Sequence, residues 1–576
     1  MKFLNNFIEQ LCEAENLIDI SSKCSAQQSS TSKWSKEDDA RQVLIDNKGD
    51  FANHTAPELN PWLIIDLEKL CYPAYIIIQN RSKKPFDEIA SRLSVECSSD
   101  SIEYKPLHKG ELHFGHLPDS MPLILPLKGK IASRFIKLSL VSSIKMPLHL
   151  KRVNILIGKK PDLTQNQNNV VFYSSRNDGL GERLKSLLNA IVLSDLYNTE
   201  FKFTWSNPPN LGESHAVTEA DSTFSPAFYE KHVVETLPNN IHELDKRINF
   251  FNRSLEKKPA IRVSQRSIYN QIPELKNYIS SSAYAKAFSK IEFSANINEA
   301  INLAKSLELP ANVVSIHLRG GDIVYGRYRH GDRYTSKVIS HAQADYIISS
   351  LKNTNINVLI FGQNKQVCRY FADKFNAFYF GDRADVCEFS SMQLAIFDMV
   401  LMSRSNKIFS GSSGFSQLSA LIGSGDINSP EDYFNATAMA NHILKFLNSD
   451  ELRHFDDFQN AFACWHLVFS YRNIVGLDKS IRLLEKACSF DVNNLFYLLV
   501  LSTLYFEKGD YKSSERAIDS ILKRTDDTFE KEGTYKFLKA HKHPDGTGPL
   551  QNYKQKFLNM KSSNLVGAAE LAKDFS

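Results

Sequence analysis

Three segments of the chain carry residue types that could bind an anion or a sugar. The first is SSRNDGLGERL at 174–184, where Gly179 and Gly181 lie between a predicted strand and a predicted helix. Glycine lets the backbone approach a ligand closely, and the N–H groups that open the helix near Glu182 could receive an anion or a sugar hydroxyl. A tight turn from strand to helix would need the same glycines without any ligand.

The second segment is VVSIHLRGGDIVYGRYRHGDRY at 313–334, which begins in a predicted buried strand and ends in an arginine-rich loop. His317 and Arg319 alternate with apolar residues, so both side chains are predicted on one face. An arginine at the carboxyl end of a parallel strand lies where α/β proteins bind ligands, and its planar fork suits a diphosphate. The alternative is a structural ion pair between Arg319 and Asp322.

The third segment, FDMVLMSRSNKIFSGSSGFSQLSALIG at 397–423, places small residues between a predicted strand and a predicted helix. Backbone N–H groups and hydroxyls at such a helix start can bind phosphate. Helix capping would account for any one serine, but not for the whole cluster. The cluster consists of Ser410, Gly411, Ser412, Ser413 and Gly414.

In this order, the three segments resemble the motifs of the α-1,2, α-1,6 and protein O-fucosyltransferase superfamily, over residues 170–425. The matching patterns are G-x-G-x-R, H-x-R-x-x-D, and an aspartate followed by a serine-rich turn. The resemblance implies a GT-B fold of two Rossmann-like halves. It also implies an inverting transferase that uses GDP-fucose as its donor and requires no metal or other cofactor.

The resemblance further implies roles for single residues. Arg319 would neutralise the donor diphosphate and the leaving group, and His317 would lie near the nucleoside. Ser412 and Ser413 would hold phosphate, and Asp398 would support their loop from its helix. The implied donor-binding set is Gly179, Gly181, Arg183, His317, Arg319, Asp398, Ser410, Gly411, Ser412 and Ser413.

The chain departs from this pattern at Glu182, where an asparagine is common, and at Gly320-Gly321, where a second basic residue often occurs. An inverting transfer also needs a group that takes the acceptor proton. Asp322 is our first candidate because it directly follows the donor-binding strand, although it could equally orient Arg319; Glu182 and His330 are the alternatives. No Asp-x-Asp pair ends a hydrophobic strand, and a fixed positive charge can stabilise a leaving group without a metal.

These segments need parallel sheets to position them, and from residue 170 predicted strands alternate with predicted helices. Strands are predicted at 170–175, 312–318, 357–362, 377–380 and 407–410, and helices at 182–197, 340–352, 365–375, 390–403 and 414–422. Residues 206–290 between the two halves are polar and predicted to be irregular.

The N-terminal part is predicted to be all-β. The segments PWLIIDL, AYIIIQN, RFIKLSLV and LKRVNILIG are short and rich in β-formers, with turn residues between them. Their succession resembles the discoidin, or coagulation-factor type C, sandwich, a jelly-roll module often used to bind carbohydrate. In that family Trp62 and Asp66 would be structural, supporting the core and a turn.

The C-terminal part is predicted to be helical and repetitive. Tyr471, Leu477, Ser480 and Leu484 align with Tyr505, Tyr511, Ser514 and Ile518 at a spacing of 34, the tetratricopeptide period. The apolar stripe is expected to be core between helices, and two copies are too few to be stable alone. We therefore expect the repeats to pack on the preceding domain.

The resulting division has six parts and a multidomain fold class of β-sandwich, central α/β and C-terminal all-α. The parts are an N-terminal helix (1–19), a discoidin-like carbohydrate-binding sandwich (20–158), a linker (159–169), an acceptor-side Rossmann-like half (170–310), a donor-side half (311–450) and tetratricopeptide-like helices (451–576).

The composition excludes several classes of protein. The 576 residues suffice for several domains, and 42% hydrophobic with 23% charged residues excludes disordered and fibrous proteins. A net charge of +4 does not favour nucleic acid as a partner. The eight scattered cysteines form no C-x-x-C pair, which predicts reduced, mostly buried thiols.

The first 20 residues carry three glutamates within a helical apolar pattern, which argues against a secretory signal. No apolar run in the sequence is long enough for a membrane span. We expect a cytoplasmic enzyme, with association at the inner face of the cytoplasmic membrane left open. The leading hypothesis is fucose transfer to a glycan acceptor in bacterial surface polysaccharide synthesis, with a protein partner on the helical repeats. The alternatives are another nucleotide sugar or a non-catalytic carbohydrate-binding scaffold.

Overall fold

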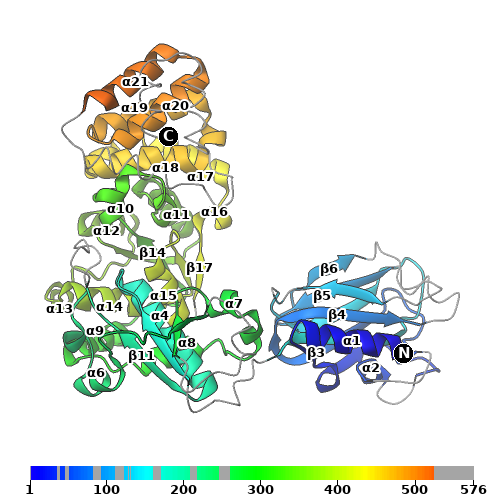
Figure 1. The fold of residues 1–576 in the computed structure, drawn as a ribbon. Coiled ribbons are helices and arrows are strands. Elements are labelled where there is room, and N and C mark those ends of the chain that lie inside the picture. The colour runs from blue at the N-terminus through cyan, green and yellow to red at the C-terminus, as the bar shows by residue number, and fades with distance from the viewer. Residues whose placement is uncertain are drawn as a thin grey trace. The chain divides into compact units, whose positions relative to one another are not determined.

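The computed structural model describes residues 2–35, 39–45, 51–81, 92–109, 122–127, 129, 131–159, 170–207, 217–244, 260–423 and 425–524 (Figure 1). The chain divides into two compact units. One comprises Met1–Ser175, Ser186–Phe203 and Thr236–Ala283, and the other comprises Arg176–Lys185, Thr204–Glu235 and Tyr284–Ser576. Within the described ranges, no helix combines the length and the apolar character needed to cross a bilayer.

The N-terminal part of the first unit is a two-sheet β-sandwich preceded by helix α1 (Lys2–Ala14). One sheet has the order β1-β9-β4-β7 and the other β2-β3-β8-β5-β6. The strands are β1 (Leu17–Asp19), β2 (Ser25–Gln28), β3 (Trp62–Cys71), β4 (Pro73–Asn80), β5 (Leu93–Ser98), β6 (Lys105–Lys109), β7 (Leu123–Pro126), β8 (Ser133–Leu140) and β9 (Leu150–Gly158), with a short helix α2 (Asp39–Gln42). The four predicted strands are confirmed. The predicted N-terminal helix is present, but it ends at Ala14 and not at 19, because Leu17–Asp19 pair with β9 as part of the sandwich.

Strand β3 shows how alternation builds the core of the sandwich. Leu63, Ile65 and Leu67 are buried, whereas Trp62 and Asp66 lie on the opposite, partly exposed face. The expectation that Trp62 belongs to the core is therefore wrong, because its position in the alternation points it outward. Asp66 does have a structural role: it accepts two hydrogen bonds from Arg134, at 3.0 Å each, which lower the pKa of its carboxyl group.

The first α/β sheet also belongs to the first unit. Its order is β11-β10-β13-β12, and β13 is parallel to both of its neighbours. Its elements are β10 (Val171–Ser175), β11 (Glu200–Thr204), β12 (His242–Glu243) and β13 (Ala260–Val263), and helix α4 (Leu180–Tyr197) follows β10. Helix α4 is tied to the end of β13, since the Ser186 hydroxyl donates to the Val263 carbonyl at 2.7 Å.

Residues 206–290 were expected to be irregular, and this is wrong for their described part. They hold strands β12 and β13 and four short helices, which are too short to show a periodic apolar pattern. The helices are α5 (Ala220–Thr223), α6 (Pro226–His232), α7 (Ile268–Gln271) and α8 (Ala283–Ser289). The proposed linker lies outside the described residues except for Lys159.

The second unit contains a parallel sheet of order β15-β14-β16-β17. Its strands are β14 (Val313–Leu318), β15 (Asn357–Gly362), β16 (Lys407–Phe409) and β17 (Asp426–Asn428). Its longer helices are α9 (Ala295–Ser306), α11 (His341–Lys352), α12 (Lys365–Phe375), α14 (Ser391–Met402), α15 (Gly414–Ile422) and α17 (Ala436–Phe446), with short helices α10 (Gly321–Val324), α13 (Ala384–Cys387) and α16 (Pro430–Tyr433). The predicted strand at 377–380 is wrong, because only Phe378 pairs, in a single bridge to Leu359.

Two helical hairpins end the described chain. They are α18 (Asp457–Val475) with α19 (Leu477–Phe490), and α20 (Leu495–Lys508) with α21 (Tyr511–Lys523). Gly476 joins the two helices of the first pair, and Gly509 joins those of the second. Each has φ of +84°, which glycine adopts without strain. The repeated helix pairs are therefore present, and the rest of the predicted helical region, from 525 onward, lies outside the described residues.

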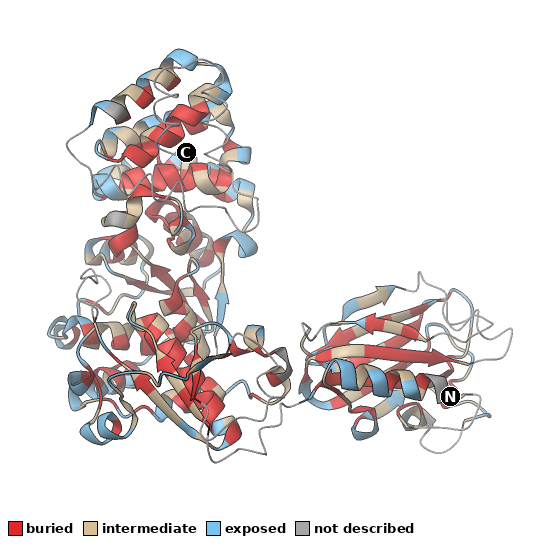
Figure 2. Ribbon diagram, in the orientation of Figure 1, coloured by how far each residue is buried: buried red, intermediate tan, exposed pale blue. Residues whose placement is uncertain are grey.

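The hairpins pack on the α/β part of the second unit, as expected. One apolar cluster runs from Val314 and Ile316 of β14 through α11 and α17 to Trp465 and Leu499 of the hairpins. Figure 2 shows this continuous buried interior. All eight cysteines are free thiols, and five of them are buried.

Candidate functional site

The site is built around the carboxyl end of β14. All six residues of this strand are buried, and hydrogen bonds to β15 and β16 on either side fix its position. Arg319 is the first residue after the strand, so its side chain leaves the sheet at the edge where the parallel strands end. The predicted placement of Arg319 is therefore found.

His317 is buried within this strand and joins it to the start of α15. Its Nδ1 atom lies 2.6 Å from the Ser416 hydroxyl, which also accepts a hydrogen bond from Ser410 at 2.9 Å. Burial, assisted by the charge of Arg319, lowers the pKa of His317 to about 3. The imidazole is therefore neutral at physiological pH, and its Nδ1 accepts a hydrogen bond from the Ser416 hydroxyl.

Arg319 and Asp322 form the ion pair that the sequence left as an alternative role. The Nη2 atom of Arg319 lies 3.1 Å from Oδ1 of Asp322, and the arginine side chain is 22% exposed. The Nε atom is buried and has no hydrogen-bond partner among the described residues. The ion pair therefore engages Nη2 of Arg319 and leaves its Nε without an acceptor.

Gly321 explains one departure from the family pattern. Its φ is +42°, and a Cβ atom added there would lie 2.5 Å from Oε1 of Gln363. That amide oxygen accepts a hydrogen bond from the N–H of Gly320, at 3.3 Å. A basic side chain at position 321 would therefore strain the backbone and displace the Gln363 amide.

The serine-rich turn lies against the segment that follows the arginine-rich loop. A Cβ atom added to Gly411 would lie 2.5 Å from the carbonyl oxygen of Ser336, and Ser412 N–H donates to the same oxygen at 3.0 Å. Ser413 is fully buried at the start of α15, yet its hydroxyl makes no capping hydrogen bond. Within the described chain this hydroxyl has no hydrogen-bond partner, so ordinary helix capping does not explain Ser413.

Lys337 is a residue of this site that sequence reasoning missed. It ends the short 3₁₀ helix Thr335–Lys337, and its ammonium lies 4.7 Å from the centre of the Tyr334 ring. Burial and the charge of Arg319 lower its pKa, and the carboxylates of Glu182 and Asp322 oppose this shift. No motif marks Lys337 in the sequence, because only folding brings it close to Arg319.

Gly179 and Gly181, just before and within the first turn of α4, have packing roles, and their approach to a ligand stays a prediction. A Cβ atom added to Gly181 would lie 2.9 Å from the backbone nitrogen of Phe415, so this glycine lets α4 and α15 begin in close contact. The Gly179 carbonyl accepts hydrogen bonds from the N–H groups of Glu182 and Arg183 in the first turn of α4. Both glycines thus have structural reasons to be present.

Two charged residues of α4 also face α15. Glu182 lies 3.2 Å from Lys185, whose ammonium donates to Oε1 of Gln417 at 2.9 Å. The Glu182 carboxylate occupies the space beside Gly414. Lys185, which the sequence did not mark, adds a third cation to those of Arg319 and Lys337.

Arg183 is only 1% exposed and is held by protein groups. Its Nε atom donates to the Asp178 carbonyl at 2.6 Å, Nη2 donates to Asn207 at 2.9 Å, and the guanidinium lies 5.3 Å from the centre of the Trp205 ring. Burial lowers its pKa. These contacts make Arg183 a support for its own turn. Its buried Nη1 atom has no hydrogen-bond partner among the described residues, and its contact with the donor stays a prediction.

Asp398 and His330 are also placed differently from the expectations. Burial raises the pKa of Asp398 to about 7, opposed by the charge of Lys365. Within the described chain no hydrogen bond joins Asp398 to the serine turn, so the expected support of that turn is not found. His330 is buried in the 3₁₀ helix Arg327–His330, at 3% exposure.

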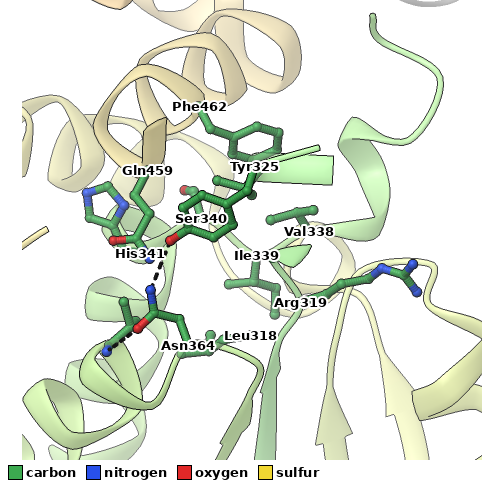
Figure 3. Close-up of a pocket in the computed structure, with 13 residues that line it drawn as sticks. Leu318, Arg319, Tyr325, Val338, Ile339, Ser340, His341, Asn364, Gln459 and Phe462 are labelled. Atoms are coloured by element: carbon green, nitrogen blue, oxygen red, sulfur yellow. Dashed lines mark hydrogen bonds between the residues drawn. The ribbon is translucent and has the colours of Figure 1, made fainter. Parts of the chain in front are cut away.

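A small pocket lies beside the end of β14, between α10, the start of α12 and α18 (Figure 3). Its volume is about 40 Å³, enough for a few water molecules but far below the roughly 300 Å³ or more of typical ligand pockets. Figure 3 shows Arg319 pointing away from Tyr325, Asn364 and Gln459. The exposed end of Arg319 therefore faces a different side from this pocket.

No group of three or more His, Cys, Asp or Glu side chains in the described ranges is arranged to hold a metal ion. The groups that converge are instead cations and hydroxyl or N–H donors from β14, α4, α15 and the 3₁₀ helix Thr335–Lys337. Cations and donors of this kind suit an anionic ligand, although the carboxylates of Glu182 and Asp322 lie among them.

No protein-family model and no curated protein matches the chain. Among solved structures, a fucose-binding module of Streptococcus pneumoniae is 22% identical, covers 24% of this chain and 96% of its own, and has a TM-score of 0.21. The lectin domain of lectinolysin, in complex with Lewis B antigen, is 21% identical over 24% of this chain and 95% of its own, with a TM-score of 0.21.

A fucosyltransferase, NodZ from Bradyrhizobium, is 14% identical, covers 44% of this chain and 94% of its own, and has a TM-score of 0.29. These identities and TM-scores are too low to assign the chain to a family. The functional argument therefore rests on the residues of the site.

Proposed function

We propose that this protein is an inverting, metal-independent glycosyltransferase with a GT-B arrangement, which transfers fucose from GDP-fucose to a glycan acceptor. One observation carries the proposal. Among the described residues, Nε of Arg319 and the hydroxyl of Ser413 are buried without hydrogen-bond partners, and the half-buried ammonium of Lys337 interacts with the charge of Arg319. Unpaired buried donors are costly, and a bound diphosphate would satisfy them.

The charges of the site support the same ligand. Three cations, Arg319, Lys337 and Lys185, face two carboxylates, Glu182 and Asp322, which leaves one uncompensated positive charge. A nucleoside diphosphate gains negative charge as it leaves the sugar. Fixed cations in a partly dehydrated site stabilise that charge strongly and need no metal.

The proposed transfer is a single displacement at the anomeric carbon of the donor sugar. The acceptor oxygen forms a bond to the anomeric carbon from one face, while the bond from that carbon to the β-phosphate oxygen breaks on the other. The electron pair of the broken bond stays on GDP, beside Arg319. A base takes the acceptor proton, and Asp322 is our candidate, with Glu182 and His330 as alternatives.

Fucose is chosen as the donor sugar on the resemblance of the three motifs, and another nucleotide sugar in the same site is the first alternative. The sandwich would hold a glycan, and the helical hairpins would contact a partner protein during bacterial surface polysaccharide synthesis. In that role the enzyme would work in the cytoplasm or at the inner face of its membrane. The second alternative is a scaffold that binds carbohydrate without catalysis.

A donor screen tests the proposal. The purified chain is incubated, with a chelator present, with GDP-fucose, other nucleotide sugars and candidate glycan acceptors, and free nucleoside diphosphate is measured. Arg319→Ala should abolish release, whereas Arg369→Ala, which removes an exposed arginine of α12, should not. Turnover of another donor would discard fucose and keep the enzyme, and the absence of binding to any nucleotide would favour the scaffold.

A further inference from the structure

We propose that Lys337 is a second cation of the diphosphate site and contacts the donor's phosphate oxygens together with Arg319. This inference rests on the proposed function and extends it to a residue outside all three motifs. It also names the chemistry of the contact, a lysine ammonium on a phosphate oxygen.

The backbone around Lys337 is built against the serine turn. The carbonyl of Ser336 accepts the N–H of Ser412, and the absence of a side chain on Gly411 lets the turn touch the main chain at Ser336 and Lys337. On the other side, the hydroxyl of Thr335 accepts a hydrogen bond from Nε1 of Trp465 at 3.0 Å. The backbone of Lys337 is therefore fixed by contacts on two sides, and its side chain begins next to the serine turn.

The surroundings of the ammonium favour an anion. Arg319 and Lys185 act on it with like charge, and Glu182 and Asp322 with opposite charge. Each of these carboxylates is already engaged, Glu182 with Lys185 and Asp322 with Arg319. Across the described ranges the Lys337 ammonium forms no ion pair within 4.0 Å and no hydrogen bond, and it lies over the Tyr334 ring.

A partly buried charge of this kind costs stability in the free protein, because the Tyr334 ring and the two engaged carboxylates replace its lost water only in part. Positions that cost stability in this way are characteristic of binding sites. The loop after Arg319 has glycine at both positions 320 and 321, so this loop supplies no second cation there. Lys337, from another element, supplies that charge.

The test compares Lys337→Met, which keeps the length of the side chain and removes its charge, with Lys337→Arg, which keeps the charge. Lys445→Ala, at an exposed position of α17, is the control for the loss of one positive charge. Binding of GDP and of inorganic pyrophosphate to the full chain is measured by calorimetry. Since hydrogen bonds to charged groups contribute about 1.5–3 kcal/mol, Lys337→Met should weaken both ligands roughly 10- to 150-fold.

The expected pattern also includes thermal unfolding without ligand. Lys337→Met should be as stable as the wild type or more stable, which separates loss of binding from loss of folding. Lys337→Arg should retain more affinity than Lys337→Met, and Lys445→Ala should bind like the wild type. Equal GDP binding by the wild type and Lys337→Met would overturn the role of Lys337 while leaving the proposed function intact.

Two other outcomes separate the two proposals. Pyrophosphate binding that depends on Lys337, with no binding of any nucleotide sugar, would keep the anion site and overturn the proposed transferase. Binding of neither pyrophosphate nor GDP by the wild-type chain would overturn both.

Discussion

Gly411→Ala offers the sharpest test of the serine turn, because the added methyl group has no space. A Cβ atom there would lie 2.5 Å from the Ser336 carbonyl oxygen and 2.6 Å from that of Lys337. Ordinary contacts of this kind are near 3.5 Å, so the intrusion is about 1 Å, and it is against backbone, which cannot rotate away. The turn and the main chain at Lys337 must therefore move apart.

The expected cost can be stated. Extra methyl groups in a well-packed region cost typically 1–3 kcal/mol, and a clash with backbone belongs at the upper end, so we expect about 3 kcal/mol. At roughly 2–4 °C per kcal/mol for a sizeable domain, the Tm should fall by about 6–12 °C. GDP affinity should fall as well, because the Ser413 hydroxyl and the Lys337 ammonium would no longer be held together.

Gly509→Ala is the matched control. Gly509 has φ of +84° in the hairpin between α20 and α21, and no atom lies within 4 Å of an added Cβ. Backbone strain alone should cost about 1 kcal/mol there, far from the serine turn. The assays are thermal unfolding and GDP calorimetry on both variants. If Gly411→Ala unfolds and binds GDP like the wild type, the close contact between turn and lysine segment is not present in solution.

Three further predictions concern buried charges. Burial raises the pKa of Asp398 to about 7. The stability that the protonated carboxyl contributes is therefore present below its unfolded-state pKa near 3.9 and is lost as pH rises through 7. Asp398→Asn should flatten the resulting decline in Tm between pH 4 and 8. The pKa of His317 is lowered to about 3, so stability is lost as pH falls below about 6.5 towards 3, and His317→Gln should reduce this acid sensitivity. Asp491 lies 3.2 Å from Arg329 and is 3% exposed, so Asp491→Asn should cost roughly 3 kcal/mol in urea unfolding; an unchanged midpoint would show that this ion pair does not anchor the arginine-rich loop to the hairpins.

Most elements near the site could be predicted from the sequence. Strand β14, helix α15 and the junction between β16 and the serine turn carry strong local signals, namely an apolar run, a helical period and a glycine-serine cluster. The short strand β17 and the helices between 217 and 289 carry no such signal, because each spans too few residues to show a period. The failed strand at 377–380 shows the reverse case, in which β-forming residues find only one pairing position.

The roles of single residues were less accessible. Gly181 and Gly321 were conspicuous in the sequence, but their neighbours were not predictable. Phe415 lies beside Gly181 and Gln363 lies beside Gly321, and both neighbours are distant along the chain. Arg183 has the residue type of a phosphate ligand, yet its contacts with Asp178 and Asn207 turn it inward. A motif specifies which residue types are present, and it does not specify which neighbours satisfy them.

By itself the sequence determined the succession of modules, the helical repeat of 34 residues and the three segments that meet near the end of β14. These depend on local periodicity and on turn residues, which act over a few positions along the chain. Only the tertiary structure decided that Lys337 and Lys185 join Arg319, and that the Ser413 hydroxyl is left without a partner. Those facts depend on burial and on distances between segments remote in sequence, because desolvation and charge act through space.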